Sequence, residues 1–338
     1  MIRNTLLGTA ALVAALAASA ASAAEVNVYT TREPGLIQPL LDSFTAKTGT
    51  KVNTVFLKDG LAERVASEGT SSPADILMTV DAGNLVDLVE KGVTQTIESA
   101  VLVEAVPAQL RDPGNQWFGL SYRARVVYAA KDLDISAITY EGLADPKWNG
   151  KICIRSGQHP YNTALFAAYL AHHGAESTDK WLAALKNNLA RKAGGGDRDG
   201  ARDIMGGICD LAVANSYYVG LMRSGKGGED QVKWGEAIKV VLPTFEGGGT
   251  QVNISGAALA KNAPNKAEAV QLLEYLVSDD AQKIYAEANY EYPVKAGIAA
   301  DPLIASLGTL KIDDKPLTEI IENRKQASEL AEKVGFDN

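Results

Sequence analysis

Short runs rich in β-branched residues alternate with helix-like segments from residue 26 onward. Residues 26–29 alternate apolar and polar side chains with a period of two, which predicts a strand. The segment that begins at Pro34 has apolar residues at helical spacing instead: Leu36, Ile37, Leu40, Leu41 and Phe44. Further strands are expected at 51–57 and 74–80, and further helices at 61–66 and 85–89. Strand–helix–strand units of this kind favour α/β layers around a parallel sheet.

The middle of the chain predicts a second sheet. A strand-like stretch at 118–131 is interrupted at 122–125, and we interpret it as a crossing from one lobe to another. After it the sequence predicts central strands at 151–156 and 209–215, a helix at 178–190 and a return strand at 239–245. Gly247-Gly248-Gly249 predicts a flexible joint before 254–261 rejoins the first sheet, which makes a hinge of two crossings. Helices are expected at 265–277, 281–287 and 317–334.

The first residues have the pattern of a secretion signal. Arg3 precedes an apolar run at 6–18, and Ala21-Ser22-Ala23 fits the small-x-small site of signal peptidase. The run is shorter than the ~20 residues of a bilayer span, so we expect a signal peptide at 1–23 that is cleaved rather than kept as an anchor. The mature chain is therefore expected in the periplasm, without a membrane span.

The length and charge of the chain limit its organisation and partners. A chain of 338 residues exceeds what one compact core usually serves, so two lobes are expected. We place the N-terminal lobe at 24–123 plus 248–305, and the C-terminal lobe at 124–247 plus 306–338. The formal net charge of −8 argues against nucleic acid and anionic lipid as partners, because each needs a basic face. We expect a monomer.

The two cysteines of the chain, Cys153 and Cys209, lie at the beginning of strands of the same predicted lobe. We expect them to form a disulfide, because an exported protein matures where disulfides persist. A metal site is the less favoured alternative. The sequence has no CxxC spacing, and His159, His172 and His173 do not form a cluster spaced for metal binding with the cysteines.

Tyrosines stand where two predicted strands end. Tyr217 and Tyr218 follow the strand at 209–215, and Tyr161 follows the strand at 151–156. Ligand clefts of open α/β sheets lie outside the carboxyl ends of the strands. A lone tyrosine at such a place is usually a half-buried packing residue. Two consecutive tyrosines, however, can face one ligand only if the chain turns there, since side chains alternate along a strand.

Several phenols in one cleft suit a hard, highly charged cation. A phenol has a pKa near 10 and loses its proton readily only when such a cation replaces it. Three phenolates from Tyr161, Tyr217 and Tyr218 would balance the charge of ferric iron and leave room for a small anion or water. Arg32, with Arg123 or Arg125 from the crossing strand, could hold that anion through bidentate donors. The alternative for each arginine is a solvated surface charge.

Other candidates are weaker. His159 could ligate a metal, although a loop histidine more often faces solvent. Glu33 could supply a carboxylate, against the simpler alternative of an ion pair with Arg32. Asp197-Arg198-Asp199-Gly200 is similar to half of a calcium loop, but it lacks a carboxylate at the twelfth position and is discarded. The glycine clusters at 194–196, 206–207 and 227–228 fit no phosphate loop and are interpreted as turns.

Taken with these residues, the sequence resembles the periplasmic ferric-iron-binding proteins of iron ABC transporters, in the branch that uses tyrosine ligands and carbonate. The resemblance covers the whole mature chain. The motifs that carry it are Val26-Asn27-Val28-Tyr29 with Arg32, Ser72-Pro73-Ala74-Asp75, Gln116-Trp117-Phe118-Gly119-Leu120 with Arg123-Ala124-Arg125, Asn215-Ser216-Tyr217-Tyr218, Asn253-Ile254-Ser255-Gly256 and Glu291-Tyr292-Pro293-Val294.

The resemblance implies a type II periplasmic binding protein fold, with Fe³⁺ as transported ligand and carbonate or bicarbonate as synergistic anion. It implies Tyr161, Tyr217 and Tyr218 as metal ligands, and Arg32 and Arg123 as the groups that approach the metal or its anion from the other lobe. The implied partner is an inner-membrane ABC permease. Relatives often have a His or Tyr just after the arginine, where this chain has Glu33-Pro34-Gly35. An anion, water or Glu33 is therefore left to complete the site.

Two other classes of function remain as alternatives. A binding protein of the same architecture could take a polyamine, a sugar or phosphate, since the fold alone does not define the ligand. The aromatic platforms or acidic clusters that such ligands need are not evident beside the tyrosines. An enzyme is disfavoured, because the sequence has no GxSxG, HExxH, Cys–His or phosphate-loop motif.

Overall fold

The computed structural model describes residues 24–338, and the expected signal peptide at 1–23 lies outside them. The strands in the described part are β1 (Glu25–Thr30), β2 (Lys51–Phe56), β3 (Ile76–Thr79), β4 (Thr94–Gln95), β5 (Trp117–Ala130), β6 (Ile152–Cys153), β7 (Leu211–Asn215), β8 (Ile238–Val241), β9 (Val252–Ala260) and β10 (Tyr292–Pro293). The α-helices are α1 (Pro34–Thr48), α2 (Leu61–Glu68), α3 (Ala82–Glu90), α4 (Ala100–Ala105), α5 (Pro160–Asn187), α6 (Asp197–Met205), α7 (Tyr217–Arg223), α8 (Glu229–Glu236), α9 (Lys266–Leu276), α10 (Asp279–Asn289), α11 (Pro302–Ala305), α12 (Leu317–Glu322) and α13 (Arg324–Lys333).

The first third of the chain forms the expected βαβ units. β1 pairs in parallel with β2 on one side and with β3 on the other. The apolar stripe of α1 is buried at Ile37, Leu40, Leu41 and Phe44, as its spacing predicts. β3 then pairs antiparallel with β9, which returns from much later in the sequence. The first sheet is therefore mixed, with a parallel part followed by an antiparallel return strand.

The long strand β5 joins the two halves of the molecule. It pairs antiparallel with β9 along residues 117–124 and with β7 along residues 125–129, so the strand order runs β2-β1-β3-β9-β5-β7-β6. The predicted interruption at 122–125 is wrong, because β5 continues through it. Arg123 and Arg125 are both buried in this segment, where each finds polar partners. The charges that suggested a break belong to the interior.

The second sheet has a short edge strand where the sequence predicted a central one. β7 lies between β5 and β6, as expected for a central strand. The other predicted central strand, at 151–156, is only the two-residue β6 at the end of the strand order. The chain leaves the sheet after Cys153 and reaches α5 at Pro160.

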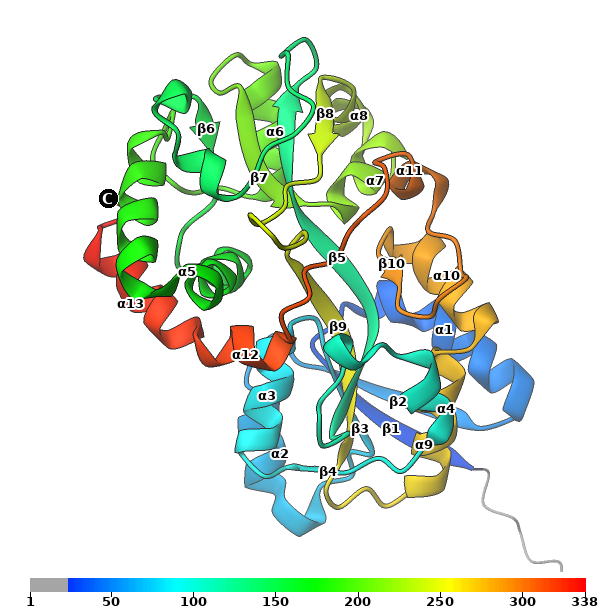
Figure 1. Ribbon diagram of the computed structural model, residues 1–338. Helices are drawn as coiled ribbons and strands as arrows, with labels where there is room; N and C mark the ends of the chain where they lie inside the picture. Colours follow the sequence, from blue (N-terminus) through cyan, green and yellow to red (C-terminus); the bar gives the residue numbers. More distant parts are fainter. Residues whose placement is uncertain (1–23) are drawn as a thin grey trace, which may run out of the picture.

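Two helical segments also differ from expectation. α5 covers 28 residues, with a non-helical kink at Gly174, so the helix expected at 178–190 is only its second half. The single helix expected at 317–334 is the pair α12 and α13, which part at Asn323. Figure 1 shows this C-terminal pair, in red, lying along α5.

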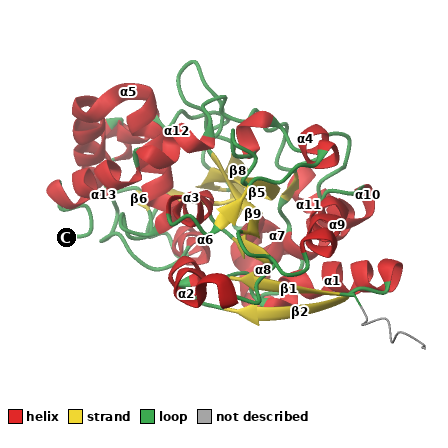
Figure 2. Cartoon of the chain, turned by 90° about the horizontal axis from the view of Figure 1, so that it is seen from below, coloured by secondary structure: helices red, strands yellow, loops and turns green. Residues whose placement is uncertain are grey.

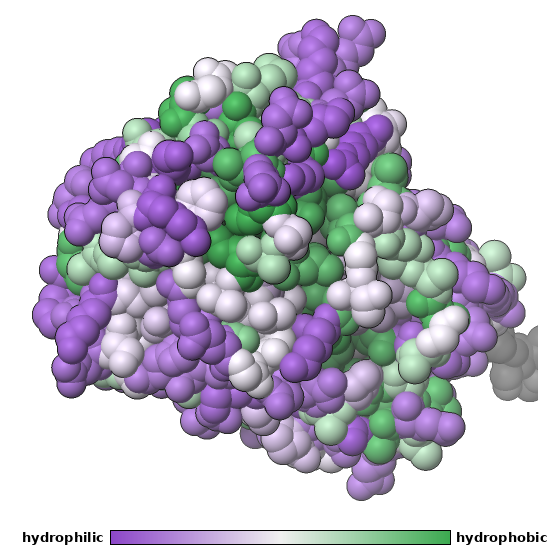
Figure 3. All heavy atoms as spheres, turned by 45° about the horizontal axis from the view of Figure 1, so that its top comes forward, coloured by the Kyte–Doolittle hydropathy of each residue, from purple (hydrophilic) through white to green (hydrophobic). Residues whose placement is uncertain are grey.

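Strands occupy the interior and helices surround them, as the α/β prediction requires. Seen from below, the strands have α5, α12 and α13 on one side and α4, α9 and α10 on the other (Figure 2). β5 and β9 run between an upper and a lower group of elements (Figure 1), which agrees with the predicted two-lobed fold. The space-filling view has apolar residues toward its middle and hydrophilic residues over much of the rest (Figure 3). The boundaries proposed for the lobes stay a prediction.

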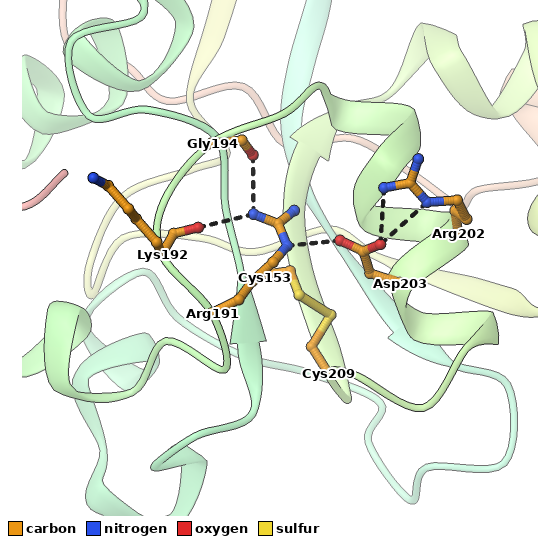
Figure 4. The surroundings of a disulfide bond; sticks show 7 residues. All are labelled: Cys153, Arg191, Lys192, Gly194, Arg202, Asp203 and Cys209. Atoms are coloured by element: carbon orange, nitrogen blue, oxygen red, sulfur yellow. Dashed lines mark hydrogen bonds and ion pairs between the residues drawn. A yellow bond between two sulfur atoms is a disulfide. The ribbon is translucent and has the colours of Figure 1, made fainter. Parts of the chain in front are cut away.

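The predicted disulfide between Cys153 and Cys209 is confirmed, with the two Cα atoms 5.9 Å apart. It connects the end of β6 to the residues that precede β7 and closes a loop across 56 positions. Bridges that close loops of this size stabilise a fold by roughly 2–4 kcal/mol. Figure 4 shows Asp203 near this bridge, paired with Arg191 and Arg202. None of the helices described in residues 24–338 is long and apolar enough to cross a bilayer.

Candidate functional site

The structure brings Tyr161, Tyr217 and Tyr218 together. The hydroxyl oxygens of Tyr161 and Tyr217 lie 3.4 Å apart, and the ring centroids of Tyr217 and Tyr218 lie 4.1 Å apart. Tyr161 is the second residue of α5, whereas the other two are the first residues of α7. Three phenols from two helices therefore share one location, although 56 positions separate Tyr161 from Tyr217.

The chain turns at the end of β7, which is the condition under which adjacent tyrosines can face one ligand. Ser216 follows the strand in a helical conformation and starts α7. The Ser216 amide donates to the Ala124 carbonyl at 2.9 Å, and the Ala124 amide donates to the Ser216 Oγ at 3.1 Å. This reciprocal pair fixes the turn to β5, so Tyr217 and Tyr218 leave the sheet side by side instead of on opposite faces.

Burial makes these phenols reluctant to ionise by themselves. The pKa of Tyr217 is raised well above its usual value, first by burial and then by the neighbouring Tyr161 and Tyr218. The pKa of Tyr218 is also raised, first by burial and then by Tyr161 and Asp197. At neutral pH both side chains are therefore protonated unless a cation takes the place of the protons.

Of the two arginines predicted to face the tyrosines, Arg123 lies on β5 and Arg32 lies two residues beyond the end of β1. The guanidinium carbon of Arg123 lies 5.7 Å from the ring centroid of Tyr161. Burial lowers the pKa of Arg32, but Glu291 outweighs it, with smaller contributions from Tyr285 and Tyr217, so the pKa is raised overall. Both arginines are buried, and the Nε atoms of both lack a hydrogen-bond partner within the described residues. Arg123 thus lies beside Tyr161, whereas Arg32 is paired with Glu291.

Glu291 is a site residue that the sequence analysis did not single out. Its carboxylate pairs with the Arg32 Nη1 at 3.1 Å and accepts from Ser255 Oγ at 3.2 Å, and Ser121 donates to it as well. Burial alone would raise the pKa of Glu291, but Arg32 and Arg123 hold it below its usual value. The only signal in the sequence is its place at the head of the Glu291-Tyr292-Pro293-Val294 motif.

Arg125 is neither a surface charge nor free to hold an anion. It is buried, and its guanidinium donates to the Asp197 carboxylate at 2.7 Å and to the Asn162 Oδ1 at 2.5 Å. Asp197 comes from the segment that was discarded as half of a calcium loop. Arg123 and Arg125 were both candidates for holding the anion from the crossing strand, and of the two only Arg123 faces a tyrosine of the site.

His159 lies next to Tyr161, whereas Glu33 is exposed to solvent. The His159 Nδ1 accepts from the Tyr161 amide at 3.2 Å and caps α5, and burial followed by Arg155 lowers the His159 pKa to about 4. Glu33 is exposed and, within residues 24–338, forms no ion pair, so the expected pair with Arg32 is wrong: Arg32 pairs with Glu291. Within residues 24–338, no group of three or more His, Cys, Asp or Glu side chains is placed to hold a metal ion.

Comparison with known proteins places this chain in a family. Residues 71–306 match the sequence profile of bacterial extracellular solute-binding proteins. The chain belongs to this family. Its relatives include iron uptake protein A2 of a Synechocystis species, 39% identical over 99% of this chain and 98% of the relative.

Two solved structures that are similar to this chain extend the comparison. The Bordetella ferric binding protein is 65% identical, covers 93% of this chain and all of its own, and superposes with a TM-score of 0.90. A Trichodesmium protein in complex with iron and citrate is 41% identical over 92% of this chain and 99% of its own, with a TM-score of 0.87. These relatives are named for iron uptake or iron binding, and none of the three is named as an enzyme.

Proposed function

We propose that this chain is a periplasmic binding protein that captures ferric iron between its lobes and delivers it to an inner-membrane ABC permease. The observation that carries the proposal is the convergence of three phenols, with the hydroxyls of Tyr161 and Tyr217 3.4 Å apart. The names of the relatives support iron as the ligand. The chain acts as a monomer and performs no catalysis.

Charge and ligand chemistry favour ferric iron at the tyrosines. Three phenolates from Tyr161, Tyr217 and Tyr218 neutralise a 3+ ion, and hard oxygen anions suit such an ion. The gain from binding offsets the cost of removing protons from buried phenols, which a weaker cation could not do. A neutral sugar or an organic cation provides no comparable reason to gather three phenols.

The remaining coordination positions are filled by an anion held on Arg32 and Arg123. Carbonate or bicarbonate is the anion that we propose, and the citrate named in the Trichodesmium complex makes citrate the one to compare with it. Glu33, one of the three alternatives for completing the site, is exposed in this structure, so we assign these positions to the anion. Because Arg123 belongs to the proposed N-terminal lobe and Tyr161 to the C-terminal lobe, a shared ion and anion couple metal capture to closure of the cleft.

Visible spectra of the iron-loaded protein test this function. Phenolate-to-Fe³⁺ charge transfer gives a visible absorption band, which a polyamine, sugar or phosphate complex lacks. Tyr217→Phe and Tyr218→Phe should weaken iron binding by more than the roughly 10–100-fold that loss of an outer partner costs. Both variants should keep the fold, since only a hydroxyl is removed.

Two control variants make the test specific. Tyr275 lies on α9, away from the three proposed ligands, and its hydroxyl donates to Ser43 Oγ at 2.7 Å. Tyr275→Phe removes this hydroxyl and should leave the band unchanged. His159→Ala should also keep the colour if histidine is not a ligand. Loss of the band in the His159 variant, with both phenylalanine variants unaffected, would make the ligand assignment wrong. A wild-type protein without any band would reject ferric iron as the ligand.

A further inference from the structure

One buried ion pair contacts residues next to the beginnings of both helices that carry the tyrosines. Arg125, at the middle of the molecule on β5, donates from Nη1 to Asp197 Oδ2 at 2.7 Å, and both side chains are almost completely buried. Asp197 is the first residue of α6. Neither residue belongs to the group of tyrosines and arginines that we assign to the iron and its anion.

Asp197 accepts hydrogen bonds from three different segments. Its Oδ2 accepts from the Arg125 guanidinium and from the backbone N–H of Asn215, both at 2.7 Å. Its Oδ1 accepts from the Arg155 Nη1 at 3.2 Å. These donors come from β5, from the end of β7 and from the segment that precedes α5. A close approach of α6 to β7 makes this possible: a Cβ at Gly200 would lie 2.8 Å from the Ala212 Cβ.

Each of these contacts ends next to a tyrosine. Asn215 lies two residues before Tyr217 and also accepts from Arg125 Nη1 at 3.0 Å. Asn162, which directly follows Tyr161, accepts from Arg125 Nη2 at 2.5 Å. The guanidinium carbon of Arg155 lies 5.1 Å from the ring centroid of Tyr161. A single carboxylate is thus connected, through one intermediate at most, to the beginnings of α5 and α7.

We propose that Asp197 is a positioning residue for iron binding, which sets the distance between Tyr161 and the pair Tyr217–Tyr218. This inference rests on the proposed ferric function. Phenolates from two separate helices coordinate one ion well only when both helices are held in place before the ion arrives. A buried ion pair is weak support for stability by itself, so a role in placing the ligands explains better why this one touches both segments.

Asp197→Asn tests the proposal, and Asp203→Asn is its matched control. Both aspartates are buried on α6 and each pairs with two arginines, but Asp203 lies near the disulfide, with Arg191 and Arg202 as partners (Figure 4). An asparagine at 197 presents one amide group where an oxygen had accepted, so at least one of the three donors is released. We expect Asp197→Asn to lower ferric affinity by about 10–100-fold and to shift the phenolate charge-transfer band. Asp203→Asn should keep both affinity and band.

The outcomes separate this inference from the proposed function. If the wild type and both variants bind iron equally with the same band, the positioning role is wrong and the ferric function stands. Equal losses in both variants would also overturn it, because they would reflect general destabilisation. If the wild type shows no band, the ferric function fails and the inference fails with it.

A second variant keeps the test decisive if Asp197→Asn does not fold. Arg155 is more exposed than Asp197, so Arg155→Gln removes one branch of the same network at lower cost to the fold. It releases the ring of Tyr161 and should shift the band with a smaller loss of affinity. An unchanged band in folded Arg155→Gln would overturn the proposal.

Discussion

Replacing Gly220 by alanine should open the cleft without unfolding the protein. Gly220 lies one turn into α7, in the part that we assign to the C-terminal lobe, and Tyr290 lies in the part assigned to the N-terminal lobe. A Cβ at position 220 would stand 2.3 Å from Tyr290 Cγ and 2.6 Å from Tyr290 Cβ. These atoms lie near the backbone, so a simple rotation of the ring does not remove the overlap.

Tyr290 has little freedom to move away. It is buried, and its backbone is in the left-handed region with φ of 56°. The Lys226 ammonium of the opposite lobe lies 4.6 Å from its ring centroid. An added methyl group should therefore strain every conformation in which α7 contacts Tyr290, at a cost of about 1–3 kcal/mol.

Two opposite effects of this substitution can be measured separately. Alanine in a helix stabilises the free protein by roughly 1 kcal/mol relative to glycine. We predict that the strain falls on the closed form, so that 1–3 kcal/mol corresponds to a loss of about 5- to 150-fold in ferric affinity. Thermal unfolding of the iron-free protein and competition with a chelator, followed at the charge-transfer band, give the two quantities.

A control glycine and one result decide this prediction. Gly235→Ala on α8 adds a Cβ 3.0 Å from Arg223 Cγ within one lobe, so it should change stability but not iron affinity. Small-angle scattering should show the iron-loaded Gly220→Ala protein more open than the wild type. If this variant binds iron as tightly as the wild type and closes equally, the contact with Tyr290 is not part of the iron-bound form and the reasoning is wrong.

Two further predictions concern protons. Because the three proposed ligands bind the ion as phenolates, and burial raises the pKa of Tyr217 and Tyr218 in the iron-free protein, binding should release up to three protons. Affinity should then fall by up to about 10³-fold per pH unit on acidification. A pH-stat that detects no proton release would contradict this. Glu291→Gln leaves Arg32 buried without its carboxylate and should cost about 3–5 kcal/mol at neutral pH. The pKa of Glu291 is lower in the folded protein than in the unfolded chain. Its contribution to stability is therefore present above the unfolded pKa and is lost as the pH falls through the folded pKa. Denaturant curves of the variant and the wild type should converge in acid.

Local periodicity predicted the elements whose pattern is complete within a few residues. β1, α1, β2, α2 and β3 are at the expected places. The helices α1 and α2 each have one buried and one exposed face, and the short apolar run of β3 is buried throughout. The first half of α5 was missed since residues 162–170 are all buried, and a helix that is apolar on every side has no stripe to detect. β5 was read as interrupted because its buried arginines find partners that local sequence does not reveal.

The candidate site shows the same limit. The argument from strand ends brought Tyr161, Tyr217 and Tyr218 to one place, where the structure has them, although their role as ligands stays a prediction. Asp197 and Glu291 were missed because their partners lie 72 and 259 positions away, at Arg125 and Arg32. A carboxylate that pairs over such a distance looks like any surface acid until the fold is known.

The spacing of Arg123 and Arg125 on β5 has a consequence for building chimeric proteins from this family. The two arginines are two positions apart and so point to the same side of one strand, one toward the proposed anion and the other toward Asp197. Inserting or deleting one residue between them would turn one guanidinium to the opposite side. A lobe exchanged between two relatives at this junction should therefore keep ferric binding only when the count of residues through β5 is preserved, whereas loops far from β5 can change length freely.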